Sequence, residues 1–180
     1  MYPVAKQSTL LLPSGQAMFY NFLLNEVLAS QLGDGYEFWI VAPWVKDFSL
    51  KKPYHVSFQE IVETKQESLH LFDVLHQMAA NGGRVYITVG SDKSDKEYHP
   101  PLQQLCKRSN NIQVHVFRSL RNKLHTKAYA GRYGALDGSP NLTNSGVNQN
   151  IELFTYSYDE RSIAQLSQFC RQHFERAEQL

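Results

Sequence analysis

The sequence predicts a single α/β domain in which helices cover both faces of a mixed, mostly parallel β-sheet. Strand-like segments, rich in β-branched and aromatic residues, alternate with segments whose apolar residues recur at helical spacing. The chain of 180 residues is long enough for one domain with an ordinary core. It contains no internal repeat and no low-complexity segment, so we expect one domain over residues 1–180, beginning with a helical segment over residues 1–35.

Residue patterns place the elements of the first half in order. A helix begins at Ser14, a suitable N-cap, because apolar residues follow it at helical spacing until glycines break the pattern at positions 33 and 35. Aromatic and β-branched residues predict a strand over residues 37–44, and we expect residues 46–56 to form an irregular loop. A second helix contains the apolar residues from Leu69 to Met78, and residues 84–89 form the next strand.

The second half contains more strands than helices. A polar loop over residues 91–96 leads to a short helix that begins at Pro100 and ends near Asn110. We then expect strands over residues 112–117, 124–130 and 151–156, with a further strand at Gly138. A final helix, capped by Ser157 or Asp159, has an apolar side made of Ile163, Leu166, Phe169, Cys170 and Phe174. Strands that follow one another without a helix predict an antiparallel hairpin late in the chain.

The charge distribution favours a polyanionic partner for one part of the chain. The net charge is only +1, so no bulk field draws the protein to nucleic acid or to a membrane. Between Tyr98 and Leu136, however, there is no acidic residue. The basic residues of this stretch are Lys107, Arg108, Arg118, Arg121, Lys123, Lys127 and Arg132. Such a stretch suits a polyanionic substrate, and the alternative is a solvated basic face without function.

The cysteines and the N-terminal residues argue against several classes of protein. Cys106 and Cys170 lie far apart in predicted helices, and no cysteine pair or histidine cluster has zinc-site spacing, so we expect neither a disulfide framework nor a metal site. The first residues lack the apolar core of a signal peptide, and the apolar run over residues 9–13 is too short to span a bilayer. We therefore expect a cytoplasmic protein with no membrane partner and no cofactor.

The most informative segment is the predicted strand over residues 124–130. Side chains two apart on a strand share a face, so His125, Lys127 and Tyr129 point one way and their neighbours point the other. An imidazole and an ammonium group side by side suit a reaction at a phosphodiester. The imidazole can attack phosphorus or transfer a proton, and the ammonium group neutralises charge on the phosphoryl oxygens.

A Gly-Ser-x-Asn element and a lone glutamate follow this strand. Gly138 lets the backbone approach a ligand closely, while the Ser139 hydroxyl and the Asn141 amide can hydrogen-bond phosphate oxygens without adding charge. Glu152 is the only charged residue of the last predicted strand, and its carboxylate could hold an imidazole in one tautomer. Each element alone is common as a surface pair, a turn or a solvated group. Their joint occurrence in this order indicates a phosphoryl-transfer site.

Together these residues resemble the HKD motif of the phospholipase D superfamily, H-x-K-x4-D-x6-G-S-x-N, with the glutamate that follows it in the small nucleases of that superfamily. The residues that match are His125, Lys127, Ser139, Asn141 and Glu152. Arg132 stands at the position of the motif's aspartate, and the spacing from histidine to glycine is one residue shorter. The motif region covers residues 124–153, and the order of the elements upstream also fits one repeat of the family.

The resemblance implies a single phospholipase D-like domain with a metal-free, two-step mechanism. Members with one motif pair two chains about a two-fold axis, so we expect a homodimer in which two copies of His125 share one site. One copy would attack phosphorus to give a phosphohistidine, and the other would protonate the leaving oxygen and then activate water. Lys127 and Asn141 would hold the phosphoryl oxygens with help from Ser139, while Glu152 would orient the imidazole.

The resemblance also implies a substrate, which we expect to be nucleic acid, with DNA favoured over RNA, cut by an endonuclease of this superfamily. The expected substrate contacts are Arg118, Arg121, Lys123 and Gly138. Family association further suggests protein partners in restriction or phage defence, which the sequence does not identify. Two alternatives stay open: a phospholipid phosphodiesterase similar to the cardiolipin hydrolases, and a catalytically decayed module that only binds nucleic acid.

Overall fold

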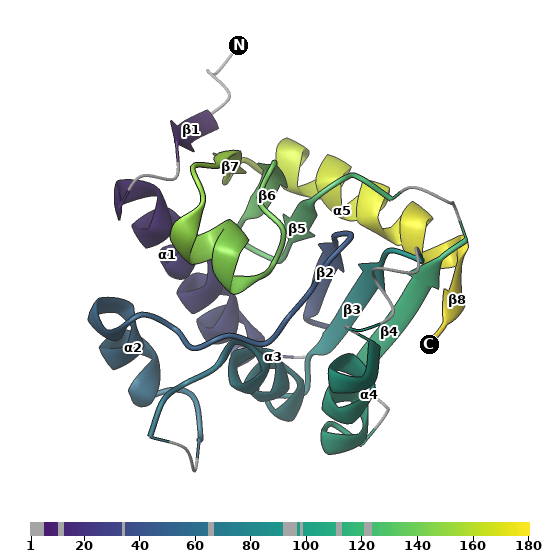
Figure 1. Ribbon diagram of the computed structural model, residues 1–180, viewed down its shortest axis with the longest axis horizontal. Coiled ribbons are helices and arrows are strands. Elements are labelled where there is room, and N and C mark those ends of the chain that lie inside the picture. Colours follow the sequence, from purple (N-terminus) through teal and green to yellow (C-terminus); the bar gives the residue numbers. More distant parts are fainter. Residues whose placement is uncertain are drawn as a thin grey trace.

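The computed structural model describes residues 6–10, 13–33, 35–64, 67–91, 97, 99–110, 113–120 and 124–180. Their strands form one eight-stranded sheet in the spatial order β1-β7-β6-β5-β2-β3-β4-β8 (Figure 1). The strands are β1 (Lys6–Leu10), β2 (Glu37–Val41), β3 (Arg84–Val89), β4 (Val114–Ser119), β5 (Ala128–Ala130), β6 (Ala135–Gly138), β7 (Leu153–Ser157) and β8 (Ala177–Gln179). The helices are α1 (Pro13–Ser30), α2 (Lys52–Gln59), α3 (Leu71–Ala80), α4 (His99–Arg108), the π-helix η2 (Ser145–Gln149) and α5 (Glu160–Glu175).

The sheet is mixed, but antiparallel pairings outnumber parallel ones among the described strands. Only β2–β3 and β3–β4 pair in parallel, and the other five pairings are antiparallel. The α/β class is confirmed, whereas the prediction of a mostly parallel sheet was wrong. A parallel pair needs a crossover of roughly a dozen residues or more. The link between β5 and β6 is only the turn at residues 131–134, and the edge strands β1 and β8 also pair antiparallel.

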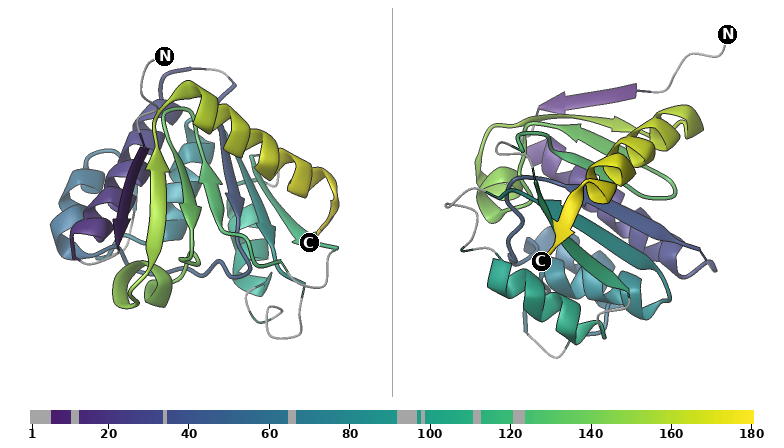
Figure 2. Two further views of the ribbon diagram at one scale, coloured as in Figure 1. Left: turned by 90° about the horizontal axis from the view of Figure 1, so that it is seen from above. Right: turned by 90° about the vertical axis from the view of Figure 1, so that its right-hand side faces the viewer.

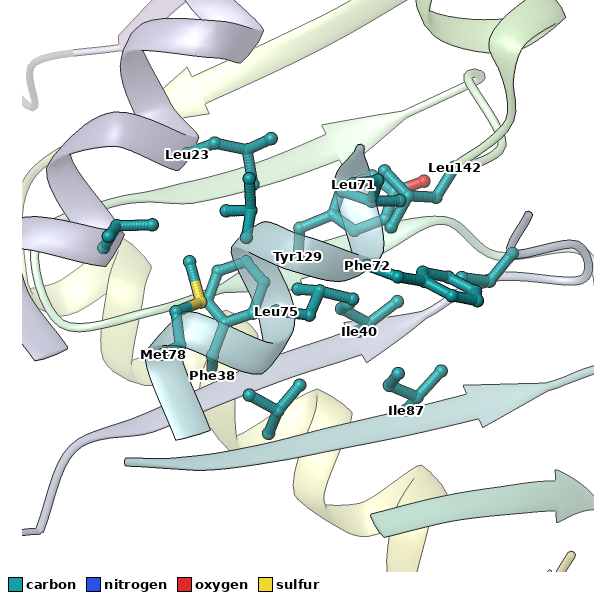
Figure 3. Packing of buried hydrophobic residues seen from close by; sticks show 14 of the residues in the cluster. Leu23, Phe38, Ile40, Leu71, Phe72, Leu75, Met78, Ile87, Tyr129 and Leu142 are labelled. Carbon is teal, nitrogen blue, oxygen red and sulfur yellow. The ribbon is translucent and has the colours of Figure 1, made fainter. Parts of the chain in front are cut away.

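Helices cover both faces of the sheet, as the sequence predicted (Figure 2). Successive residues of β2 point to opposite faces: Phe38 and Ile40 join the main core with α1 and α3, whereas Trp39 packs in a second cluster against α5. Figure 3 shows the main core from close by, with Tyr129 of β5 and Leu142 on the side of the motif. Each large apolar side chain buried in this way contributes roughly 1.5–3 kcal/mol, so the motif segments rest on a well-packed base.

Some elements differ from the sequence prediction. A loop was expected over residues 46–56, but α2 covers residues 52–59, with a proline in its first turn and Phe58 buried in the main core. The strands β1 and β8 were not predicted, because short edge strands depend on the strands beside them more than on their own residue pattern. The strand predicted over residues 124–130 is shorter: β5 begins only at Ala128.

Two of the predicted helix starts, at Ser14 and at the last helix, lie close to the observed ones. The helix expected from Ser14 begins at Pro13, one residue earlier. The last helix, α5, has the predicted cap at Asp159, whose side chain accepts a hydrogen bond from Ser162 N at 2.9 Å. Local side-chain chemistry therefore places the start of α5 as expected.

Candidate active site

The three parts of the motif meet at the ends of three neighbouring strands, where β5 begins, β6 ends and β7 begins (Figure 1). Two backbone hydrogen bonds join them. Gly138 N donates to Lys127 O at 3.2 Å, and Ser139 N donates to Leu153 O at 2.9 Å. The H-x-K segment, the Gly-Ser-x-Asn segment and the chain around Glu152 are therefore neighbours in space, as the motif requires.

His125 and Lys127 lie just before β5 and differ in burial. His125 is exposed, and its ring has no hydrogen-bond partner in the described part of the chain. Lys127 is only 7% exposed, and its Nζ donates to the His125 carbonyl at 2.9 Å. Burial lowers the pKa of the Lys127 ammonium group, and the Glu152 carboxylate opposes this shift. An exposed imidazole and a cation held by a hydrogen bond thus lie two residues apart on one segment.

Tyr129 anchors the Gly-Ser-x-Asn segment to β5. Its hydroxyl donates to the Pro140 carbonyl at 2.6 Å, and its ring packs in the main core (Figure 3). Burial raises the pKa of the Tyr129 phenol well above its ordinary value, so the hydroxyl stays protonated and remains a donor. Ala128 and Ala130 pack on the opposite face with α5, which confirms the predicted alternation of faces at these positions.

Glu152 is held by two side chains. Its Oε2 accepts a hydrogen bond from Ser139 Oγ at 2.5 Å, and its Oε1 accepts one from Asn150 Nδ2 at 3.1 Å. The Ser139 hydroxyl oxygen in turn accepts from Leu153 N at 3.0 Å. We expected Ser139 to contact phosphate and Glu152 to contact the imidazole, yet here their side chains contact each other. Asn150 was not predicted, although a spacing of two residues from Glu152 indicates a shared face on an extended segment.

Asn141 places a half-buried side-chain amide in the same region. Its Oδ1 is buried and has no hydrogen-bond partner among the described residues. An unsatisfied buried polar atom costs about 1–3 kcal/mol, so it marks a place where a ligand can complete the hydrogen bonding. Gly146 of η2 packs directly on the Asn141 backbone, where a Cβ would lie 2.3 Å from the Asn141 carbonyl oxygen. Glycine is therefore required there, and the close contact fixes the backbone that carries the amide.

A hollow of about 380 Å³ opens between the Gly-Ser-x-Asn segment and the loop that follows β2. Its lining includes Trp44, Lys46 and Asp47 from that loop, together with Asn141 and Glu152. Burial raises the pKa of the Asp47 carboxyl group. A larger hollow of about 1220 Å³ lies among α2, α3 and α4 and contains no motif residue, so we place the candidate site at the smaller one.

Only some of the residues predicted to contact the substrate lie near the candidate site in the described structure. Arg118 is the second-last residue of β4 and forms an ion pair with Glu178 of β8. Its strand is three strand spacings from β5, roughly 14 Å between backbones. Arg121 and Lys123 lie outside the described residues. Among the residues predicted to contact substrate, Gly138 is the one that the described structure places beside Lys127.

A buried carboxylate closes the hairpin in which the motif's aspartate is missing. Arg132 takes the position of that aspartate, in the turn between β5 and β6. Glu26 of α1 is fully buried, and accepts hydrogen bonds from Arg132 N at 2.8 Å, from Tyr133 N at 2.9 Å and from the Tyr36 hydroxyl at 3.0 Å. Burial raises the pKa of the Glu26 carboxyl group. A Cβ on Gly131 would lie 2.0 Å from Glu26 Oε2, so the turn is built around this carboxylate.

Two further findings bear on the class of site. Within the described ranges, no three His, Cys, Asp or Glu side chains lie close enough to bind one metal ion. No helix in the same part of the chain is long and apolar enough to cross a bilayer. The groups that the site does offer are an imidazole, an ammonium group, amides, a hydroxyl and a carboxylate, a set suited to phosphodiester chemistry.

Comparison with known families agrees with this geometry. The family model described as "Cardiolipin synthase, PLD-like domain" matches residues 54–177. The match covers well over half of the chain, which therefore belongs to the phospholipase D-like family. The resemblance seen in the motif is thereby confirmed, and membership supports phosphodiesterase chemistry in general. No curated protein sequence matches the chain significantly.

Solved structures share the fold over nearly the whole chain. NucT from Helicobacter pylori has a TM-score of 0.61 at 14% identity, covering 98% of this chain and 100% of its own. Nuc from Salmonella typhimurium, a phospholipase D family member, has a TM-score of 0.61 at 11% identity, covering 99% of both chains. Phosphatidylserine synthase from Haemophilus influenzae has a TM-score of 0.62 at 16% identity, covering 98% of this chain and 40% of its own. At these identities the similarity shows the fold alone.

Proposed function

We propose that the protein is a metal-independent phosphodiesterase that cleaves nucleic acid, DNA in preference to RNA, at a site shared by two copies of the chain. The observation that carries the proposal is that backbone hydrogen bonds place the segment of His125 and Lys127 beside the Gly-Ser-x-Asn segment, and that segment beside the chain around Glu152, in a phospholipase D-like sheet. The charge of Glu152 interacts with Lys127, and Asn141 and Glu152 line one hollow. The donor set explains metal independence, because it can stabilise charge and transfer protons without a divalent ion.

In the first proposed step, the exposed His125 imidazole attacks phosphorus. A P–N bond forms as the P–O bond to the leaving group breaks, and a second, protonated imidazole gives its proton to the leaving oxygen. The Lys127 ammonium group and the Asn141 amide stabilise the charge on the phosphoryl oxygens. In the second step, the now neutral second imidazole takes a proton from water, whose oxygen attacks phosphorus and releases the first imidazole.

The second imidazole comes from a second copy of His125 in this proposal. Most other described histidines have partners of their own: His70 with Asp47, His76 with Ser109, His99 with Gly90, His115 with Tyr86 and His173 with Phe169. The largely exposed apolar side chains of Ile151 and Leu153 flank Glu152 and offer a contact surface beside the site. A two-fold axis there would bring two copies of the site together.

Glu152 acts through its neighbours in this proposal. Its carboxylate fixes Ser139 and Asn150, and its charge supports the protonated form of Lys127. Rotation of the exposed His125 ring toward Glu152 in the assembled dimer would add the orienting contact that the motif implies. The basic segment that includes Arg118, Arg121 and Lys123 supports a polyanionic substrate that passes Gly138.

A phospholipid phosphodiesterase is the second candidate. It is favoured by the description of the matching family model and by the shared fold with phosphatidylserine synthase. Against it, the lining of the hollow includes Lys46, Asp47 and Asn141, which suit polar ligand groups better than acyl chains. Release of headgroup from vesicles of anionic phospholipid, with no cleavage of any nucleic acid, would establish this candidate instead.

The deciding experiment compares wild type with His125→Ala on fluorescent single- and double-stranded DNA and RNA, each with and without EDTA. We expect the wild type to cleave in EDTA and the variant to be inactive while it still binds. Loss of wild-type activity in EDTA, restored by Mg²⁺, would overturn the metal-free mechanism. Cleavage by His125→Ala at the wild-type rate would overturn the assigned site.

The shared site has its own test. Light scattering is expected to give the mass of a dimer. Mixed dimers of one wild-type and one His125→Ala chain are expected to be inactive, because each shared site needs both imidazoles. Activity that falls only in proportion to the wild-type chains present would show that each chain works alone.

A further inference from the structure

A tryptophan side chain lies in the hollow of the candidate site. Trp44 follows β2 directly and is 40% exposed, whereas Trp39 on β2 itself is only 5% exposed. Trp44 lines the hollow together with Asn141 and Glu152. A large aromatic surface left accessible beside polar groups is the usual composition of a recognition site.

The loop that carries Trp44 is fixed at both ends. Gly90 N donates to the Pro43 carbonyl at 3.1 Å, which joins the loop to the end of β3. Lys46 N donates to the Leu142 carbonyl at 2.9 Å, and Val45 forms a β-bridge with Leu142, the residue after Asn141. The backbone that carries the indole therefore keeps a constant position relative to the Gly-Ser-x-Asn segment, so little backbone ordering is lost when a ligand stacks on Trp44.

The rest of the lining is polar, which suits the polar edge of whichever base stacks on Trp44. Besides Asn141, it contains the side chains of Thr143, Asn144 and Asn150, which offer neutral donors and acceptors. Asn141 Oδ1 is buried without a partner in the described residues. The volume of about 380 Å³ suits one nucleoside-sized group. An acyl chain in this place would leave Asn141 Oδ1 without a partner.

We propose that Trp44 is a stacking platform for an unpaired base of the substrate, next to the scissile phosphate, and that the enzyme therefore acts on single-stranded nucleic acid. This inference rests on the proposed function. Both faces of a base in a duplex are covered by its neighbours, so a base can stack on Trp44 only when its strand is unpaired or locally opened. Stacking accepts every base, so we expect strand selectivity without strong sequence preference.

The test measures binding in the His125→Ala background, so that the probe is not consumed. Trp44→Ala is expected to weaken binding of a fluorescent single-stranded oligonucleotide by roughly 5- to 150-fold, and Trp44→Phe by much less, because a smaller ring can still stack. Tyr133→Ala is the matched control. Tyr133 is 50% exposed but lies in the turn between β5 and β6, at the other end of β5 from His125, so its loss should leave binding unchanged.

A probe without bases separates stacking from general damage. On an abasic sugar–phosphate oligomer of the same length, Trp44→Ala and its parent should bind equally, because the charge is present and the stacking partner is not. Emission of Trp44 should be quenched by the normal oligonucleotide only, against a constant background from buried Trp39.

The outcomes distinguish this inference from the proposed function. If single strands are cleaved but Trp44→Ala binds them as its parent does, the stacking platform is wrong and the nuclease assignment stands. Equal weakening on normal and abasic probes, or on single strands and duplex alike, also overturns the inference. If the wild type neither cleaves nor binds nucleic acid, the proposed function fails and this inference fails with it.

Discussion

The β5–β6 hairpin has a carboxylate at each end, and the two carboxylates differ in burial and in partners. Glu26 closes the turn and is fully buried, with its oxygens occupied by two backbone N–H groups and a tyrosine hydroxyl. Glu152 lies at the open end, partly exposed, and its partners are the side chains of Ser139 and Asn150. Glu26 has only structural partners, whereas Glu152 lines a hollow and interacts electrostatically with Lys127.

The difference shows that burial and a shifted pKa do not by themselves mark a catalytic carboxylate. The pKa of Glu26 is raised by burial, yet its surroundings leave no space for a substrate: a Cβ on Gly131 would already collide with it. Glu152 is the better candidate because its charge interacts with the Lys127 ammonium group, which lies on the same segment as the exposed His125. We therefore expect changes at Glu26, in the turn, to affect stability, and changes at His125 and Glu152, at the other end of the hairpin, to affect activity.

The largest loss of activity is expected on removal of the His125 side chain. His125→Ala should lower the rate of cleavage by at least roughly 10³-fold, because it removes both the nucleophile and the proton donor of the shared site. The melting temperature should stay unchanged, since the His125 side chain is exposed and packs against nothing that it would leave empty. A gel assay with labelled oligonucleotide and a thermal melt measure the two quantities. A stable, active variant would show that the chemistry lies elsewhere.

Glu152→Gln is expected to lower the turnover rate by roughly 10²-fold while stability changes little. The amide keeps the size of the side chain and one acceptor oxygen, but it loses the charge that faces Lys127. Steady-state kinetics should place the loss in kcat rather than in substrate binding. A large drop in melting temperature with normal kcat would assign Glu152 to the structural class together with Glu26.

Glu26→Gln should show the reverse pattern, with a free energy of unfolding lower by about 1–3 kcal/mol and a normal rate per folded molecule. The amide NH2 must face one of the backbone N–H groups that the carboxylate accepts. Chemical denaturation at pH 7 measures the change. Loss of activity without loss of stability would contradict the structural role of Glu26, because the turn would then be part of the site.

The effect of Glu26→Gln on stability should also depend on pH, in a direction that the pKa shift of Glu26 determines. Because the folded-state pKa of Glu26 is raised, the protonated form is favoured by folding. The protonated Glu26 therefore adds to the free energy of unfolding at pH values below the unfolded-state pKa. This addition is lost as the pH rises through the raised folded-state pKa. The stability difference between wild type and Glu26→Gln should therefore narrow as pH rises through that window, and a difference that widens would contradict the assigned shift.

The smallest effect concerns the alkaline limit of activity. Burial lowers the pKa of Lys127 and the charge of Glu152 opposes the shift, so activity should fall with rising pH below the ordinary range of lysine. Glu152→Gln should move this alkaline limb to still lower pH, in addition to lowering kcat. Profiles of kcat/KM against pH for both proteins measure the shift. Coincident alkaline limbs would show that Lys127 and Glu152 are not coupled.

Much of the candidate site could be predicted because its residues are close together in sequence. The alternation around Tyr129 is a local pattern, and the register of the hairpin follows from it. The roles of Ser139 and Glu152 were harder to predict, because their mutual contact depends on how the start of β7 pairs with the end of β6. Asn150 was not predicted for the same reason, because its amide has a partner at the site only when the fold places Glu152 within hydrogen-bond distance.

The sequence by itself determined the α/β class, the family motif and the chemical groups at the candidate site, since these depend on residue type and short spacing. Tertiary structure alone decided that antiparallel pairing dominates the sheet and that Glu26, far upstream, closes the turn at Arg132. It also brought Trp44 to the same hollow as Asn141. The physical reason is that these contacts join segments distant in the chain, and packing selects them among many pairings that local patterns allow equally.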